Sequence, residues 1–389
     1  MITPPRPKTR PIRYRLDRAI RHIAMRGIGW LAPGNEGVNP DLHGASIKKI
    51  LLVRPNFRIG NAILALPAIA AFRRNFPEAR IDYVGSPVSN LLFRNQPLNH
   101  HYVAPRRFPG VLWQYPRLIR LLRANQYDLA VDISCSQSGV GSFVVGVSGA
   151  RIRAGLTGKW DHLFNLKLPR LREGNKYRKL KEFLTAMHVE QIDYVGSLKF
   201  SAAEKIEGLR KLESLCGVKG AKTVGVFVGG RKLRGKRWPL ENFTELINGL
   251  HQRGIAVVAF LGPEENDIGD SLRVTLHPSI PVIFEPSVRK FAAIVSHLGL
   301  LICCDSGPMH LGCAVGIRVL AIFQEGDAAR WSPPPDAART VYGEDSVSAA
   351  PVLDVALEEL SFTDSTSESP TTAPRPSRPS PKTDPSVLF

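Results

Sequence analysis

The chain has 389 residues, of which 43% are hydrophobic and 22% charged, as in soluble globular proteins. This composition excludes a wholly disordered chain, a collagen and a polytopic membrane protein, and the length favours two domains. The 52 Lys and Arg residues outnumber the 34 Asp and Glu residues, so the formal net charge is +18. Such an excess indicates an anionic partner, which is a nucleic acid, a phospholipid surface or a phosphorylated substrate.

The two ends of the chain differ from the body between them. Residues 1–45 carry a net charge of +5 and residues 361–389 a net charge of 0, which leaves +13 on the body. Between Leu16 and Leu31, apolar side chains recur at helical spacing with arginines on the other faces, which predicts a basic amphipathic helix. This helix is a candidate for lying on an anionic membrane surface, and the alternative is a helix packed on its own domain. The tail, 361–389, is rich in Ser, Thr and Pro and is predicted to be disordered.

The sequence also carries information on the compartment. No apolar run approaches the roughly 20 residues that span a bilayer, and no apolar segment with a cleavage site indicates a secretory signal. Five cysteines, which include the adjacent Cys303 and Cys304, favour buried thiols in a reducing compartment over a disulfide framework. We therefore expect a cytoplasmic protein.

Short apolar runs alternate with amphipathic segments through the body of the chain. Strands are predicted at 50–53, 81–84, 129–133, 224–228, 256–261, 300–304 and 319–323, and helices at 62–75 and 241–252. Strands that alternate with helices of 10–15 residues are typical of parallel βαβ units. Two such blocks, joined near residues 200–220, predict an α/β protein with two doubly wound domains. In such sheets ligands bind at the carboxyl ends of the strands, so the loops there are candidate sites.

The first candidate loop follows strand 224–228 and leads into a helix. It begins with Gly229, Gly230 and Arg231, and five of the seven residues from 231 to 237, Lys236 among them, are basic. Glycines that allow close backbone approach, next to cations and a helix N-terminus, favour binding of a pyrophosphate. The alternative is a solvated basic loop. The Walker spacing is absent, so the loop is not a P-loop.

The second candidate loop follows strand 300–304 directly. Asp305 or Ser306 can cap the next helix, the amides of Ser306 and Gly307 would point at an anion, and His310 lies on the first turn. The alternative is that Asp305 only caps the helix. The cysteines nearby lack metal-ligand spacing, so no metal site is predicted.

A third loop, at 54–61, follows the first strand, but it lacks the dinucleotide fingerprint, and no nucleophile elbow occurs in the chain. The segments Arg54-Pro-Asn-Phe-Arg58-Ile-Gly-Asn61, Lys236-Arg-Trp-Pro239, Asp305-Ser-Gly-Pro-Met-His310-Leu and Arg330-Trp331 together resemble glycosyltransferase family 9, the ADP-heptose:lipopolysaccharide heptosyltransferases. The resemblance runs from about residue 48 to about residue 360.

This resemblance implies a GT-B fold, in which two Rossmann-like domains with doubly wound parallel sheets face each other across a cleft. The N-terminal domain, 46–205, would lie on the acceptor side, and the C-terminal domain, 206–360, would bind the donor. The implied reaction is an inverting, metal-independent transfer of heptose or a similar sugar from ADP-heptose, a substrate rather than a cofactor. The implied acceptor is the phosphorylated lipid A-core at the cytoplasmic face of the inner membrane.

The resemblance also implies roles for single residues. Lys236 would bind the donor phosphate and offset charge as ADP departs, and Asp305 would hold hydroxyls of the sugar. Ser306 and Gly307 would contact the diphosphate with His310 beside it. Either Glu264 or Glu265 would reach the ribose or the base.

One residue departs from the family pattern. Asn61 stands where well-characterised members carry an aspartate that acts as general base, and an amide cannot accept the proton. Either another carboxylate serves, for which Asp132 is the candidate, or transfer relies on positioning and leaving-group stabilisation, or activity is altered or lost. The second function hypothesis is therefore a GT-B protein that binds a nucleotide sugar or glycolipid with reduced catalysis. Nucleic-acid binding has only the charge in its favour, because no known module is present.

Overall fold

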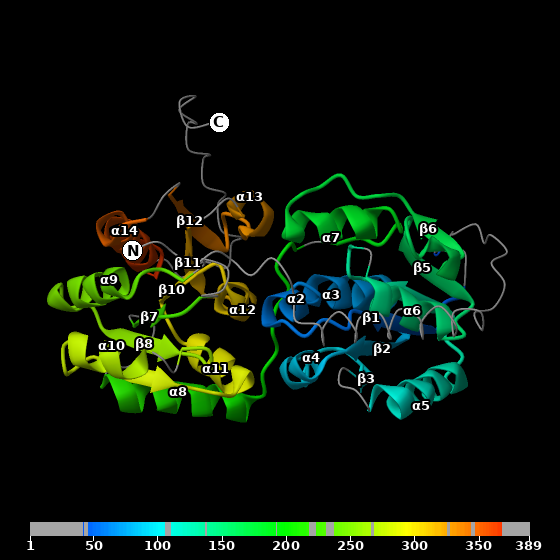
Figure 1. Ribbon diagram of the computed structural model, residues 1–389, viewed down its shortest axis with the longest axis horizontal. Coiled ribbons are helices and arrows are strands. Elements are labelled where there is room, and N and C mark those ends of the chain that lie inside the picture. The colour runs from blue at the N-terminus through cyan, green and yellow to red at the C-terminus, as the bar shows by residue number, and fades with distance from the viewer. Residues whose placement is uncertain are drawn as a thin grey trace, which may run out of the picture.

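The protein folds into two α/β domains that lie side by side, each around a six-stranded parallel sheet (Figure 1). The computed structural model describes residues 42, 46–105, 110–136, 138–191, 193–217, 223–230, 237–265, 268–324, 327–343 and 347–367. The predicted amphipathic helix within residues 16–31 and most of the predicted C-terminal tail lie outside the described residues.

The N-terminal sheet has the strand order β3-β2-β1-β4-β5-β6. Its strands are β1 (Lys49–Val53), β2 (Arg80–Gly85), β3 (His100–Val103), β4 (Leu129–Asp132), β5 (Ile152–Leu156) and β6 (Leu166–Leu168). Its helices are α2 (Ile59–Ile63), α3 (Leu66–Asn75), α4 (Pro87–Leu92), α5 (Val111–Ala124), α6 (Gly139–Val147) and α7 (Lys176–Thr185), with a short 3₁₀ turn at Asp161–Leu163. Val53 pairs with Asp132, so β1 and β4 end level with each other at the same edge of the sheet.

The C-terminal sheet has the order β12-β11-β10-β7-β8-β9. Its strands are β7 (Val224–Phe227), β8 (Val257–Leu261), β9 (Val282–Phe284), β10 (Leu300–Cys304), β11 (Arg318–Phe323) and β12 (Ala338–Tyr342). Its helices are α8 (Ala202–Cys216), α9 (Leu240–Gln252), α10 (Gly269–Thr275), α11 (Val288–Val295), α12 (Gly307–Val315), α13 (Ala328–Trp331) and α14 (Ala349–Ser367). In both domains the first strand lies between the second and the fourth, which is the doubly wound arrangement.

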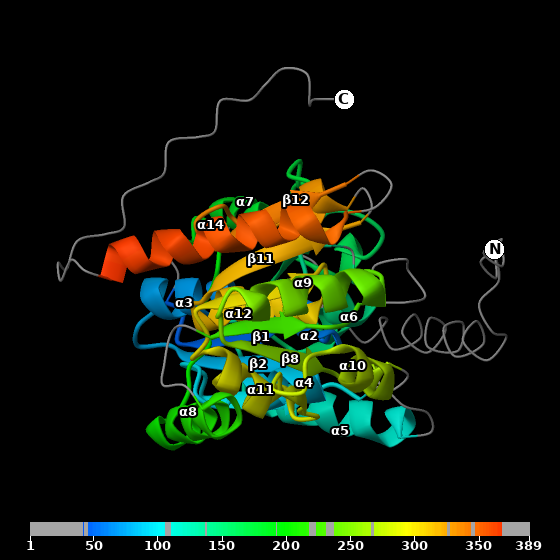
Figure 2. The same cartoon turned by 90° about the vertical axis from the view of Figure 1, so that its left-hand side faces the viewer.

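Two elements differ from the sequence prediction. The helix expected at 62–75 is two helices, α2 and α3, because Pro67 has no N–H to donate and its ring hinders a continuous helix. The helix α14 continues to Ser367, past residue 361 where the sequence predicted the start of a disordered tail. This helix runs along the outer side of the C-terminal domain (Figure 2). Within the described ranges, no helix is long and apolar enough to cross a membrane.

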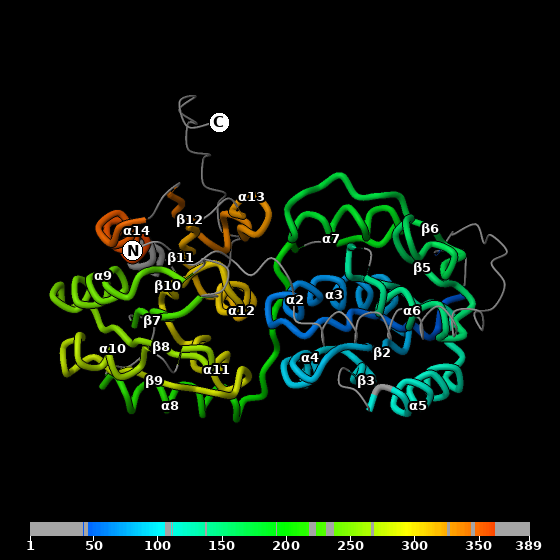
Figure 3. Tube along the Cα trace, viewed as in Figure 1, coloured from blue at the N-terminus to red at the C-terminus, as the bar shows by residue number. Residues whose placement is uncertain are grey.

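Within the described residues the chain passes from the N-terminal to the C-terminal domain between α7 and α8 (Figure 3). Arg289 on α11 binds this connection at its end, because its guanidinium donates to the backbone oxygen of Lys199 at 2.7 Å and to Glu204 at 2.8 Å. The same guanidinium donates to the backbone oxygen of Leu92 in the N-terminal domain and lies over the Phe200 ring. Arg289 is 3% exposed, so a buried cation joins both domains and the connection.

The two domains also meet where α2 faces α12. A Cβ atom added at Gly60 would lie 2.4 Å from Cδ2 of His310, and one added at Gly307 would lie 3.1 Å from Cβ of Ile59. The contact at Gly60 therefore requires glycine, because no side chain fits between the backbone and the imidazole ring. One apolar cluster continues through this contact and includes buried residues of both domains, such as Leu66 and Met309.

Candidate functional site

The loop after β10 presents the first group of predicted residues at the start of α12. Asp305 follows the last strand residue and is half-buried, and Ser306 occupies the N-cap position with an extended backbone. The Ser306 hydroxyl donates to the backbone oxygen of Cys304 at 3.1 Å, so the Ser306 side chain does not cap α12. The first amides of α12, from Gly307 onward, lie at a helix N-terminus, where the helix dipole favours an anion.

The loop after β7 begins with Gly229 and Gly230 and lies beside the β8 end. The amide of Gly230 donates to Oε1 of Glu265 at 3.4 Å, and a Cβ atom at Gly229 would lie 2.6 Å from the same oxygen. Arg231 and Lys236 lie outside the described residues. Arg237, the next residue, places its Nη2 3.6 Å from Oε1 of Glu265.

Trp238 anchors the end of this basic loop in the core of the C-terminal domain. Its ring is buried against Phe243, and its Nε1 donates to the backbone oxygen of Val347. The backbone of Trp238 also hydrogen-bonds to the thiol of Cys304, the residue before Asp305. The two loops that the sequence singled out therefore meet at one edge of the C-terminal sheet.

The structure distinguishes the two glutamates that the sequence left as alternatives. Glu265 is buried, accepts hydrogen bonds from the amides of Gly230 and Gly262, and has its pKa raised mainly by burial. Glu264 is exposed, and its backbone oxygen accepts a bond from Arg237. Glu265 thus holds the β7 and β8 loops together, whereas the carboxylate of Glu264 reaches solvent.

On the N-terminal side, Arg54 closes β1 with a buried side chain. Its amide donates to the backbone oxygen of Val84 at 2.9 Å, and its Nη1 donates to that of Ile133 at 3.0 Å. Arg54 thereby joins the carboxyl ends of β1, β2 and β4. Asn61 follows Gly60 on α2 and is half-buried near the contact between the domains.

Asp132, the alternative carboxylate, ends β4 and is 4% exposed. Its Oδ1 accepts the amide of Ser134 at 3.1 Å, and its Oδ2 accepts the hydroxyl of Ser142 at 3.1 Å. A Cβ atom at Gly141 would lie 2.7 Å from Oδ1, so α6 packs directly on the carboxylate. Burial raises the pKa of Asp132 to about 6, although the hydrogen bonds and the charge of Arg54 oppose this shift.

Four cations gather next to these strand ends. The pKa of Lys176 is lowered, first by burial and then by the charges of Arg330, Lys179 and Arg54. Lys176 also lies over the Trp331 ring, with its Nζ 5.7 Å from the centroid. Within the described residues none of the four cations forms an ion pair with a carboxylate. Positive charge from both domains is therefore concentrated at this point, which favours binding of a polyanionic ligand.

The helix α7 brings this cationic cluster to the donor-side loops. Asn175 caps α7 and donates to the backbone oxygens of Ala329 and Ser332 in the other domain, at 3.2 and 3.0 Å. The Tyr177 hydroxyl hydrogen-bonds to Nδ1 of the buried His310. Sequence reasoning missed α7, although an asparagine before a run of basic residues at 175–179 is a recognisable helix start.

Two further features bear on the chemistry. Within the described residues no group of His, Cys, Asp or Glu side chains could hold a metal ion.

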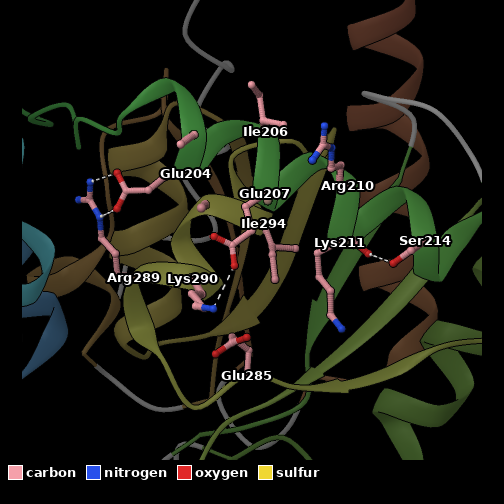
Figure 4. A pocket seen from close by; sticks show the side chains of 13 residues that line it. Glu204, Ile206, Glu207, Arg210, Lys211, Ser214, Glu285, Arg289, Lys290 and Ile294 are labelled. Atoms are coloured by element: carbon pink, nitrogen blue, oxygen red, sulfur yellow. Dashed lines mark hydrogen bonds and ion pairs between the residues drawn. The ribbon is translucent and has the colours of Figure 1, made fainter.

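A groove of about 810 Å³ lies between α8 and α11, away from the cationic cluster (Figure 4). Four of its charged side chains form ion pairs, because Glu204 binds Arg289 and Glu207 binds Lys290. The cationic cluster and the N-terminus of α12 are better suited than this groove to binding a phosphorylated sugar. Asp132 and Asp305 are carboxylates at strand ends that could accept a proton or a hydrogen bond.

Comparisons with known proteins identify the family and the fold of the chain. The model of the family described as glycosyltransferase family 9 (heptosyltransferase) matches residues 115–352. Lipopolysaccharide heptosyltransferase 3 of Escherichia coli is 25% identical over 288 residues, which are 70% of this chain and 83% of that protein.

Two solved structures share the fold. The family 9 glycosyl transferase of Veillonella parvula superposes with a TM-score of 0.72 at 18% identity, over 81% of this chain and 97% of its own. ADP-heptose LPS heptosyltransferase II of Escherichia coli superposes with a TM-score of 0.66 at 20% identity, over 81% of this chain and 99% of its own. The predicted GT-B fold with two Rossmann-like domains is confirmed.

Proposed function

This chain is a member of glycosyltransferase family 9, and on that premise we propose that it transfers heptose or a similar sugar from ADP-heptose to the lipopolysaccharide core. The observation that carries the proposal is the meeting of the β7 and β10 loops in the C-terminal domain, together with a cationic cluster to which both domains contribute. One side is suited to a nucleotide diphosphate and the other to a phosphorylated acceptor. We further propose that the transfer inverts the anomeric carbon and needs no metal.

In the proposed reaction the acceptor hydroxyl attacks the anomeric carbon while the bond from that carbon to the ADP oxygen breaks. Lys236 and the first amides of α12 stabilise the charge that develops on ADP. Asp305 accepts hydrogen bonds from the sugar hydroxyls. Asp132 takes the proton of the acceptor hydroxyl, and its pKa of about 6 makes it a better base near neutral pH than an ordinary aspartate.

The acceptor in this proposal is the phosphorylated lipid A-core. The cationic cluster of Arg54, Lys176, Lys179 and Arg330 supports it, because phosphates form charge-assisted hydrogen bonds with lysine and arginine side chains. Such an acceptor is anchored in a membrane, so the enzyme would work at the cytoplasmic face of the inner membrane, in peripheral contact with anionic lipid.

The test is ADP release by the purified full chain, supplied with ADP-heptose and a phosphorylated deep-core acceptor. We expect release that depends on both substrates. Lys236→Ala should lower turnover by about two orders of magnitude, because one preorganised charge contact to the leaving group is lost. Lys211→Ala, at an exposed lysine on α8, is the matched control and should leave turnover unchanged. Near-normal turnover of Lys236→Ala would exclude the assigned role.

Asn61 favours a second candidate, a GT-B protein that binds a nucleotide sugar or glycolipid with reduced catalysis. The amide at this position cannot take a proton. Calorimetric binding of ADP-heptose together with the absence of ADP release at any acceptor concentration would support this candidate against the enzyme.

A further inference from the structure

The helix α5 packs only one of its faces onto the N-terminal domain. Tyr115, Leu118 and Leu122 are buried in the apolar cluster on one face of the sheet. Arg123 adds a polar tie, because its Nε donates to the backbone oxygen of Val147 at 3.0 Å. The helix lies at the end of this domain away from the C-terminal domain (Figure 1).

The outward face of α5 combines large apolar side chains with arginines. Trp113 is 59% exposed and Leu112 is 57% exposed, although both are large apolar residues. Trp113, Arg117 and Arg120 follow at intervals of four and three residues, so the indole and both guanidinium groups lie along one stripe of the helix. This stripe is opposite the buried residues.

The charge of this face is entirely positive. The helix contains three arginines and no acidic residue. In the described part of the chain neither Arg117 nor Arg120 has an ion pair or a side-chain hydrogen bond. The two guanidinium groups therefore remain available to an anionic partner.

The helix α8 provides a comparison within the same protein. It also exposes an apolar side chain, Ile206, at 49%. Two of its three acidic residues are paired, however, with Glu204 bound to Arg289 and Glu207 bound to Lys290. Exposed apolar surface thus coincides with unpaired positive charge on α5 and with mixed, largely compensated charge on α8.

We propose that α5 is the surface with which the N-terminal domain docks on an anionic phospholipid bilayer. Tryptophan prefers the headgroup region of a membrane, and arginines beside it bind lipid phosphates. A helix with these two features on one face lies in the plane of the interface. The inference rests on the proposed function, in which the acceptor is a membrane lipid, and it identifies the face that meets that membrane.

The test is sedimentation of the full chain with vesicles of phosphatidylglycerol and phosphatidylcholine, with phosphatidylcholine alone as reference. Arg117→Gln/Arg120→Gln should lower the partition coefficient about thirtyfold on the mixed vesicles, the loss expected for two basic residues near an anionic surface. Trp113→Gln should lower it about tenfold. Any contribution of residues 1–45 is common to all variants and cancels in the comparison.

Matched controls separate this surface from general charge and apolarity. Arg210→Gln/Lys211→Gln removes the same charge from α8, and Val274→Gln removes an 85% exposed apolar side chain from α10. Both should bind vesicles like the parent. An equal loss in the α8 pair, or unchanged binding of the α5 variants, would overturn the proposal. So would self-association of the parent that Trp113→Gln abolishes without any effect on vesicle binding.

A separate measurement distinguishes this inference from the proposed function. With a water-soluble, deacylated acceptor, the α5 variants should release ADP at the parental rate, because α5 lies outside the candidate site. If the parent binds anionic vesicles through α5 but releases no ADP with any acceptor, the proposed function fails and the docking surface stands.

Discussion

The fourth strand of each sheet leads to an aspartate at its carboxyl end, and the two aspartates lie in different surroundings. Asp132 closes β4, is 4% exposed and accepts bonds from Ser134 and Ser142. Asp305 follows β10 directly and is half-buried at the start of α12. The same position in the same topology thus holds a dry carboxylate in one domain and a more accessible one in the other.

This difference in burial indicates different chemical roles for the two carboxylates. Removal from water raises the pKa of Asp132 to about 6, which favours proton transfer near neutral pH. A carboxylate that reaches solvent, as in Asp305, is suited to accept hydrogen bonds from hydroxyls of a bound sugar. The topology thus positions both carboxylates at the carboxyl ends of strands, and their different burial determines which role each one can take.

The largest expected effect is on turnover of Asp132→Asn. Loss of a general base should lower turnover by about 10²–10⁴-fold, with donor affinity retained because the donor loops belong to the other domain. In the parent, kcat/KM should rise with pH through about 6, and the variant should lack this rise. Turnover within about threefold of the parent would show that Asp132 is not the base.

The substitution Asp305→Asn should instead affect the binding and positioning of the donor sugar. We expect turnover about a hundredfold lower and a raised KM for the nucleotide sugar, because an amide replaces the acceptor of sugar hydroxyl bonds. The rise of kcat/KM near pH 6 should remain. Asp270→Asn on α10, whose side chain is fully exposed, is the control and should behave like the parent. A lost pH dependence in Asp305→Asn would reverse the two assignments.

Stability should change at Asp132 in a defined pH range. Because the folded state raises the pKa of this group from 3.8 to about 6, the folded state binds the proton more tightly than the unfolded state. The free energy of unfolding therefore decreases as pH rises from about 4 to about 6, by up to about 3 kcal/mol. Asp132→Asn removes this loss, so denaturant titrations should find the variant more stable than the parent above pH 6 and similar below pH 4. An equal difference at all pH values would contradict this explanation.

The smallest effect is expected for Asn61→Asp. If Asp132 already accepts the proton, a second carboxylate on α2 should change turnover by less than about twofold in steady-state assays. An increase of about 10²–10⁴-fold would mean that the parent lacks a base and that Asp132 does not serve.

Much of the fold could be predicted because its strands are continuous apolar runs. The segment 300–304 is a strand with the predicted bounds, and Asp132 and Asp305 were located by the rule for carboxyl ends of parallel strands. Pro67 also marks the break between α2 and α3 in the sequence. The prediction followed the apolar periodicity instead and placed one continuous helix there.

The cationic cluster could not be predicted in the same way. Lys176 and Arg330 are far apart in sequence, and only the contact of α7 with α13 brings them together. The different burial of Glu264 and Glu265 likewise could not be predicted, because two adjacent glutamates in a sequence do not reveal which one is buried. Local pattern thus predicts elements and loops, whereas interdomain contacts and desolvation need the folded chain.

The buried guanidinium of Arg289 bears on how substrates enter. It holds Leu92 of one domain and the connection to the other at a single point, while Gly60 and His310 touch at a different place along the same contact. Asn175 and Tyr177 on α7 form further hydrogen bonds to the C-terminal domain, so the two halves are tied at several separate places. Entry of a substrate between the domains therefore requires the contacts at Gly60 and α7 to separate, while the bonds of Arg289 would keep the two halves aligned.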